Sequence, residues 1–219
     1  MPDLIYCIDD SHVSFFSGYN AIIPKWTEDP DYKGKIECFK PIRVGPSTAY
    51  GLLSENTKSD GRRIMFAALK TIPEGSTVLL CFGEIDCRVH VCCQAIQQNK
   101  SYEAIVDDCL ERYLKVIDEV RAMGFKVIVW NIIASVKPEI EGSDMVNGSV
   151  KDRNMATVYF NSALRKRLPE DVYFLDIFDK LLDQSRWMVR TEYYMDDVHL
   201  SYSAMPFVLD ILKKEGFIE

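Results

Sequence analysis

The sequence lacks the features that accompany nucleic-acid binding and membrane insertion. Its 26 Lys and Arg residues are outnumbered by 33 Asp and Glu residues, so the formal net charge is −7. Docking on nucleic acid or on an anionic membrane surface needs a basic face. No apolar run approaches the length of about 18 residues that indicates a membrane-spanning helix. The longest run, 127–136, is interrupted by Asn131. We therefore expect no nucleic-acid partner and no membrane insertion.

Patterns for disulfides, metals and nucleotide cofactors are also missing. Seven cysteines cannot pair completely. No secretory leader is recognisable at the start of the sequence, so we expect a reducing, cytoplasmic setting. Cys92 and Cys93 are adjacent, whereas zinc sites use spaced ligand pairs with a second pair elsewhere. The glycines form neither GxGxxG nor a P-loop. We expect no metal and no cofactor.

The length and the apolar pattern predict one α/β domain spanning residues 1–219. With 219 residues and 47% hydrophobic composition, the chain fits a single large domain. Unbroken apolar strands that alternate with helices indicate a parallel sheet covered on both faces. The strands are expected near 3–9, 36–40, 77–83, 126–133 and 172–175. Helices are expected at 47–54, 61–71, 101–123, 152–167, 176–183 and 201–215, and residues 184–198 are expected to be irregular.

Three polar segments are candidates for the functional site. Residues 9–12, read Asp-Asp-Ser-His, follow the first strand, and 83–88 follow the third. A third segment, 196–199, precedes the last helix. In parallel α/β sheets, ligands collect at the carboxyl ends of the strands.

Ser11, His199 and Asp196 together suggest nucleophilic catalysis. A serine hydroxyl becomes a nucleophile when an imidazole removes its proton and an acid orients that imidazole. Asp196 lies three residues before His199, so a tight loop can place its carboxylate against the ring. Taken singly, Ser11 is also a common helix N-cap, and His199 is also an ordinary surface-loop histidine.

The combination of Asp-Ser-His, Gly-x-x-Asp and Asp-x-x-His in this order resembles the SGNH hydrolases, also called GDSL esterases. The resemblance implies a three-layer α/β/α sandwich with a five-stranded parallel sheet, of flavodoxin-like type. It implies Ser11 as the nucleophile, His199 as the base and Asp196 as the orienting acid. The oxyanion would be bound by the backbone N–H of Ser11 and by that of Gly45, with Gly51 as a second choice. Asp10 is expected to cap the turn that presents the serine.

Two departures from the family pattern affect the expected chemistry. Asp9 stands where the family has glycine, which adds a carboxylate near the serine. Ile85 stands where the family has an asparagine that donates to the oxyanion, and losing one such donor typically costs about 10²–10³ in rate. Arg88 or His90 could supply the missing donor. Arg88 is equally suited to an ion pair with a carboxylate, either Glu84 or Asp86.

The segment 83–90 is similar to a block in a subset of SGNH-like proteins linked to surface-polysaccharide biosynthesis. That similarity implies a small-molecule or glycan ester as substrate, and it leaves the oligomeric state open. Candidates for stacking on a sugar are Trp26, Trp187, Tyr193 and Tyr194, which can equally be packing residues.

Three other functions remain open at this stage. The same triad could serve an O-acyltransferase, in which a sugar hydroxyl replaces water. The fold could instead bind a glycan without catalysis, or it could be a flavodoxin-like small-molecule binding protein. A nucleophilic Cys87 paired with His90 is less favoured, because the set around Ser11 is more complete.

Overall fold

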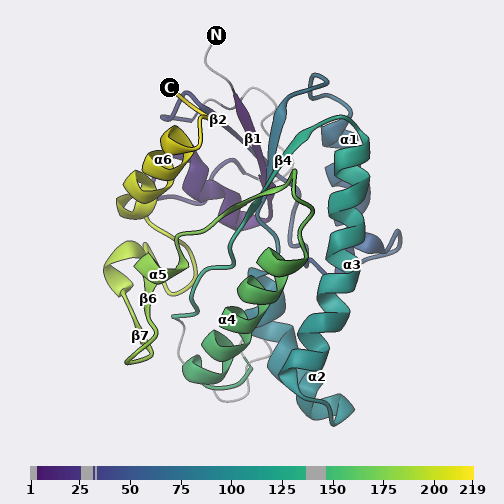
Figure 1. The fold of residues 1–219 in the computed structure, drawn as a ribbon, viewed down its shortest axis with the longest axis vertical. Coiled ribbons are helices and arrows are strands. Elements are labelled where there is room, and N and C mark those ends of the chain that lie inside the picture. The colour runs from purple at the N-terminus through teal and green to yellow at the C-terminus, as the bar shows by residue number, and fades with distance from the viewer. Residues whose placement is uncertain (1–3, 26–31, 33, 137–146) are drawn as a thin grey trace.

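The structure, a computed structural model, describes residues 4–25, 32, 34–136 and 147–219. Its centre is a five-stranded parallel sheet with the strand order β2-β1-β3-β4-β5 (Figure 1). The strands are β1 Ile5–Asp9, β2 Phe39–Arg43, β3 Thr77–Leu80, β4 Lys126–Trp130 and β5 Tyr173–Leu175. The predicted count of five parallel strands is confirmed.

The central strands are apolar on both faces because both faces are covered. In β3, Val78, Leu79 and Leu80 are all 0% exposed. Successive side chains on a strand point to opposite faces, so Leu79 and its neighbours enter two different hydrophobic clusters. An unbroken apolar run is therefore the pattern of a strand buried between two helical layers.

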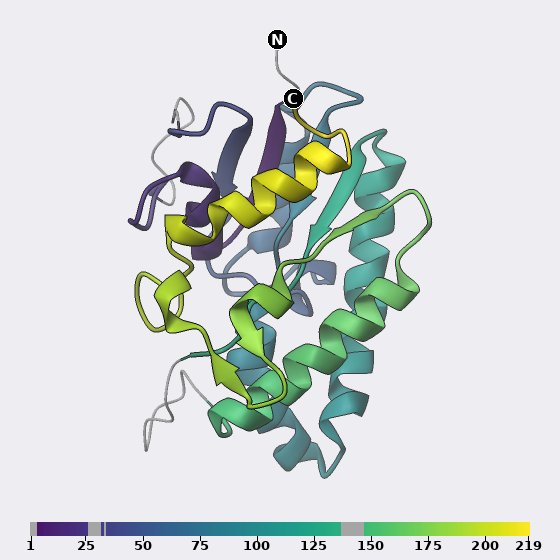
Figure 2. The same ribbon diagram turned by 60° about the vertical axis from the view of Figure 1, so that its left-hand side comes forward.

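Helices cover the two faces of the sheet in separate layers (Figures 1 and 2). One cluster contains side chains from α1 Gly61–Leu69, α2 Val91–Gln98, α3 Tyr102–Ala122 and α4 Val150–Arg167. The opposite cluster contains side chains from the 3₁₀ helix η1 Ser11–Ser17, α5 Phe178–Leu181 and α6 Met205–Lys214. This arrangement is the predicted three-layer α/β/α sandwich.

Helix α3 shows how the sequence specifies a surface helix. Its buried face repeats at helical spacing and its outer face is charged. The Ser101 side chain accepts a hydrogen bond from the Ala104 N–H at its start, and Gly124 follows its end with φ of +85°. Within the described ranges, no helix is both long enough and apolar enough to cross a bilayer.

Several predicted boundaries are wrong. Strand β2 begins at Phe39 rather than near residue 36, and it includes Pro41, which is tolerated because β2 is an edge strand. The predicted helix at 47–54 is reduced to one 3₁₀ turn, η2 Gly51–Leu53. Of the predicted helix at 176–183, only α5 is helical.

The structure also contains elements that the sequence pattern did not indicate. The segment after β3 forms one π-helical stretch, η3 Asp86–His90, which continues into α2. The segment expected to be irregular contains part of a short hairpin, in which β6 Leu182–Asp183 pairs with β7 Met188–Val189. The last turns are η4 Thr191–Tyr193 and η5 Tyr202–Ala204. The hairpin strands and the 3₁₀ turns are too short to give a periodic signal.

Candidate active site

Ser11, His199 and Asp196 form a continuous hydrogen-bonded series at the carboxyl end of the sheet. The Ser11 hydroxyl oxygen lies 2.8 Å from Nε2 of His199. On the other side of the ring, Nδ1 lies 2.9 Å from Oδ2 of Asp196. The structure thus brings together the three residues that the sequence singled out, in the order serine, histidine and aspartate.

The serine is held by a turn at the end of β1. Asp10 is the N-cap of η1, and its Oδ1 accepts a 2.9 Å hydrogen bond from the backbone N–H of His12. The predicted capping role of Asp10 is confirmed. Val13 and Phe16, on the same short helix, are buried in the core at 0% and 1% exposure. The cap and these anchors fix the backbone on both sides of Ser11.

A tight turn holds the carboxylate of Asp196 against the ring of His199. Asp196 Oδ1 accepts hydrogen bonds from the backbone N–H groups of Val198 and His199, at 2.7 and 2.6 Å. The turn is closed by a bond from the Met195 N–H to the carbonyl of His199. The spacing of three residues therefore serves both the backbone of the turn and the orientation of the ring.

The environment keeps His199 neutral. Burial and the neighbouring His12 lower its pKa, and the hydrogen bond and negative charge of Asp196 offset this only in part. Burial alone would raise the pKa of Asp196, but the N–H groups and the ring of the turn hold it below its ordinary value. Around neutral pH, Nε2 is therefore free of a proton and can accept one from Ser11.

Gly45 lies just after β2, beside the strand that leads to the serine. Its φ is +83°, a conformation that glycine adopts without strain. The preceding Val44 donates its N–H to the carbonyl of Asp9 at 2.8 Å, which ties this loop to the end of β1. Gly51, the second choice, begins η2 instead. The placement of Gly45 agrees with an oxyanion role, which remains a prediction.

The two carboxylates next to Ser11 in the sequence are both buried. Asp9 is 1% exposed, and its Oδ2 has no hydrogen-bond partner among the described residues. Burial raises the pKa of Asp9 well above its usual range, and a further increase comes from Asp10. Burial likewise raises the pKa of Asp10, although His12 opposes the shift.

Arg88 forms an ion pair with Glu84 in the structure. Arg88 Nε lies 2.6 Å from Glu84 Oε1, and both side chains are about one-tenth exposed or less. Of the two alternatives for Arg88, the ion pair is therefore the one observed. Ile85, between Glu84 and Asp86, has no hydrogen-bonding side-chain atom, so the family's asparagine donor has no counterpart at this position.

Asp86 and His90 lie in a different region of the structure. Asp86 accepts N–H bonds from Ala49 and Tyr50 at 2.7 and 3.1 Å, so it holds the loop after β2. His90 is exposed and, with Asp86, lines a separate cavity of about 370 Å³ beside α2 and α3. Asp86 is thus an internal cap for a loop.

The geometry gives little support to a nucleophilic Cys87 or to a metal site. Cys87 is 2% exposed, and burial raises the pKa of its thiol well above the usual range. A buried, protonated thiol is a poor nucleophile. Among the residues that the structure places, no group of three or more His, Cys, Asp or Glu side chains is arranged to hold a metal ion.

Of the aromatic candidates, Trp26 lies outside the described residues. Tyr194 donates its hydroxyl to the Ala134 carbonyl at 2.6 Å, and Tyr193 packs edge-on against Phe207. These two tyrosines therefore have packing partners. Trp187 is half-buried next to β7.

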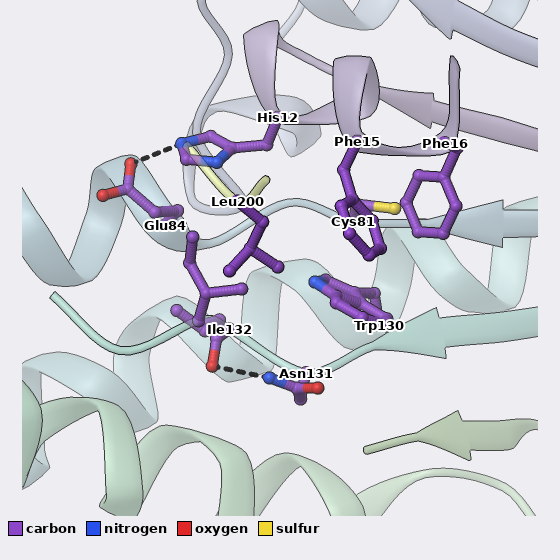
Figure 3. A pocket seen from close by; sticks show the side chains of 10 residues that line it. His12, Phe15, Phe16, Cys81, Glu84, Trp130, Asn131, Ile132 and Leu200 are labelled. Carbon is purple, nitrogen blue, oxygen red and sulfur yellow. Dashed lines mark hydrogen bonds and ion pairs between the residues drawn. The ribbon is translucent and has the colours of Figure 1, made fainter. Parts of the chain in front are cut away.

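His12 is the residue whose importance the sequence analysis missed. Its Nε2 donates to Glu84 Oε2 at 3.0 Å (Figure 3). Its ring centroid lies 4.8 Å from that of His199. His12 and Glu84 line a small cavity of about 10 Å³ that is otherwise bounded largely by apolar side chains, among them Trp130 and Leu200. The only signal in the sequence was its position directly after the candidate nucleophile.

Comparisons with solved structures identify the fold. No family model matches the sequence, and no curated protein matches it. Among solved structures, the chain is similar to a candidate acylhydrolase from Bacteroides fragilis NCTC 9343, with a TM-score of 0.62 and 15% identity over 98% of this chain and 88% of that one. It is also similar to the acetyl xylan esterase AlAXEase, with a TM-score of 0.53 and 17% identity over 97% of this chain and 99% of the other.

Both structural neighbours cover almost the whole chain, and the sheet order and the two helical layers agree with the three-layer sandwich expected from the resemblance. The chain therefore has an SGNH-hydrolase-like fold, the fold of acylhydrolases and esterases of known structure.

Proposed function

We propose that the protein is a serine esterase that removes an acyl group, in the first instance acetyl, from a glycan or sugar conjugate. The observation that carries this proposal is the hydrogen-bonded series from Ser11 through His199 to Asp196. The fold by itself does not establish an activity, because one fold hosts many functions.

Acylation begins when the Ser11 oxygen attacks the ester carbonyl carbon. His199 Nε2 takes the hydroxyl proton as the new C–O bond forms, and Asp196 stabilises the resulting imidazolium through Nδ1–H. The same proton then passes from Nε2 to the oxygen of the leaving alcohol as the ester C–O bond breaks. The products of this step are the free sugar hydroxyl and an acylated serine.

Deacylation repeats these steps with water. His199 removes a proton from a water molecule, whose oxygen attacks the acyl carbon, and the proton returns to Ser11 as the acid leaves. The backbone N–H groups of Ser11 and Gly45 stabilise the oxyanion in both steps. With Ile85 in place of a third donor, we expect a lower rate than a site with all three donors.

The choice of a glycan ester rests on two similarities. The segment 83–90 is similar to a block from proteins linked to polysaccharide biosynthesis, and one structural neighbour is an acetyl xylan esterase. If a sugar hydroxyl attacks the acyl-enzyme in place of water, the same residues perform acyl transfer. Product analysis with and without a sugar acceptor distinguishes the two outcomes.

The test combines covalent labelling with turnover. A fluorophosphonate probe should label the wild-type protein at Ser11, as mapped by mass spectrometry, and aryl acetates should be hydrolysed. Ser11→Ala should abolish both signals. Ser14→Ala is the matched control, because Ser14 lies on the same short helix and its buried Oγ has no hydrogen-bond partner among the described residues. Absence of labelling at Ser11 together with equal turnover in Ser11→Ala would refute the proposal.

A further inference from the structure

A chain of three charged side chains lies directly beside the triad. Glu84 lies between two nitrogen donors: its Oε2 is 3.0 Å from His12 Nε2, and its Oε1 is 2.6 Å from Arg88 Nε. The side chains of His12, Glu84 and Arg88 are 10%, 8% and 10% exposed. The catalytic steps proposed for Ser11 and His199 give none of them a role.

A buried ion pair is weak evidence for stability, because the cost of desolvating the charges can offset their mutual attraction. Here the series of charged side chains joins segments that lie 72 residues apart, from His12 on η1 to Glu84 after β3. Its free end is the imidazole of His12, which belongs to the residue that follows the nucleophile. The position of that imidazole therefore indicates what the ion pair holds in place.

The surroundings of His12 favour its cationic form. Its ring is faced by Glu84 from the loop after β3, by Asp9 and Asp10 from the end of β1, and by His199 from the C-terminal turn. Burial would lower the pKa of His12, but the carboxylates, with Glu84 first, raise it to about 9. Burial would likewise raise the pKa of Glu84, yet His12 and Arg88 lower it to about 2.

The imidazole of His12 lies against that of His199. The ring centroids are 4.8 Å apart and the planes are inclined by 33°. Two imidazolium ions at this separation repel each other, so a fixed positive charge on His12 disfavours protonation of His199. Glu84 and Asp196 act in the opposite direction. The Asp196 side chain, on the far side of the ring, is 44% exposed and is therefore screened.

We propose that His12, kept cationic by the carboxylate of Glu84 that Arg88 in turn holds ionised, is a positioning residue that acts through His199 and holds it unprotonated in mildly acidic conditions. This inference rests on the proposed function, since it concerns the base of the same Ser11–His199 pair. The buried series of His12, Glu84 and Arg88 thereby has a specific effect. It extends, in the acidic direction, the pH range in which His199 can accept a proton. The rate should therefore fall on the acidic side only when His199 finally takes up a proton.

A titration of the histidines tests the inference independently of any activity. The protein has only three, His12, His90 and His199, so each ring can be followed by NMR. In the wild type, His12 should stay protonated through neutral pH and His199 should titrate below the ordinary value of about 6.5. In His12→Gln, the midpoint of His199 should rise.

Kinetics give the second readout. In His12→Gln the acidic limb of kcat/KM for an aryl acetate should move up by about half to one pH unit, which is a loss of about three- to tenfold on that limb. The loss at high pH should be smaller. His90→Gln is the control and should leave the limb in place.

The outcomes separate this inference from the proposed function. A wild-type His12 that titrates near 6.5, or a His199 midpoint that is unchanged in His12→Gln, overturns the inference even if the protein is an esterase. An equal loss at every pH indicates a purely structural role and overturns it as well. Shifted midpoints without any turnover would leave the electrostatic coupling intact and refute the esterase proposal instead. The wild-type titration needs no variant, so poor folding of His12→Gln does not prevent the test.

Discussion

His199 Nε2 lies 2.8 Å from Ser11 Oγ, although 188 residues separate the two in the sequence. The contact is made because β1 ends at the same edge of the sheet to which the C-terminal turn returns before α6. Parallel strands bring their carboxyl ends to one edge, so residues from distant loops meet there.

Asp196→Asn should lower kcat/KM for an acetate ester by about 10²–10⁴ while leaving the fold intact. The asparagine oxygen can still accept the N–H bonds of the turn, but its amide cannot stabilise an imidazolium at Nδ1 of His199. The measurement is the steady-state rate, with the thermal midpoint as the check on folding. Asp197→Asn is the matched control, because this adjacent side chain is exposed and belongs to the same turn. Equal activity in the two variants would contradict the assignment of Asp196.

The stability of the wild type should fall as the pH rises through about 9. The pKa of His12 is about 9 in the folded protein, above the ordinary histidine value of 6.5 that applies to the unfolded chain. Because the folded pKa is the higher one, the stabilising contribution is fully present below about 6.5 and is lost as the pH passes the folded value. The free energy of unfolding in urea, measured between about pH 6.5 and about 9.5, tests this.

Buried cysteine thiols also contribute to the alkaline slope, since burial raises the pKa of Cys7 and Cys81 well above the usual range. The comparison with His12→Gln isolates the histidine. The variant should be less stable than the wild type near pH 6.5, and the difference should shrink toward about pH 9.5. A difference that is constant across this range would show that His12 does not change its protonation on unfolding.

Gly83→Ala should destabilise the fold by about 1–3 kcal/mol. Gly83 has φ of +128°, and an added Cβ would lie 2.5 Å from Cδ1 of Ile132. Gly75→Ala is the control: its φ is +76°, and an added Cβ would meet nothing within 4 Å. Chemical denaturation should therefore show a larger loss at Gly83.

Shortening the side chain of Ile132 tests whether contact with it causes the loss of stability in Gly83→Ala. Ile132→Ala removes both Cδ1 and Cγ1, which the new Cβ would approach to 2.5 and 2.8 Å, so the double variant should be more stable than the sum of the two single losses implies. Strict additivity would mean that the backbone conformation of Gly83, and not the lack of space beside Ile132, accounts for its loss.

Local pattern was sufficient to predict the layered α/β architecture. Four of the five strands were recognised because each is an apolar run, and the long helix α3 because its buried positions recur at helical spacing. The same pattern did not indicate α2, whose buried set in the structure is Val91 alone. Nor did it place β2 correctly, because Pro41 argues against a strand unless the strand is known to lie at an edge.

The candidate triad was also predicted from short-range features. Asp196 and His199 form a local turn, so three-residue spacing carries their geometry. Asp10 caps the turn of Ser11 two residues ahead, at His12, for the same reason. Their meeting across the chain was expected from the resemblance in motif order.

Features that depend on neighbours along the chain were predictable from the residue pattern: four of the five strands, the long helices, the serine turn and the Asp196–His199 turn. The pairing of charges became clear only in the folded protein. Glu84 joins Arg88 four residues away and His12 72 residues away, and the ring of His12 reaches that of His199 from another segment. The physical reason is that an ion pair is selected by burial and distance in the folded protein, where an unpaired charge is costly, and no local pattern specifies either quantity.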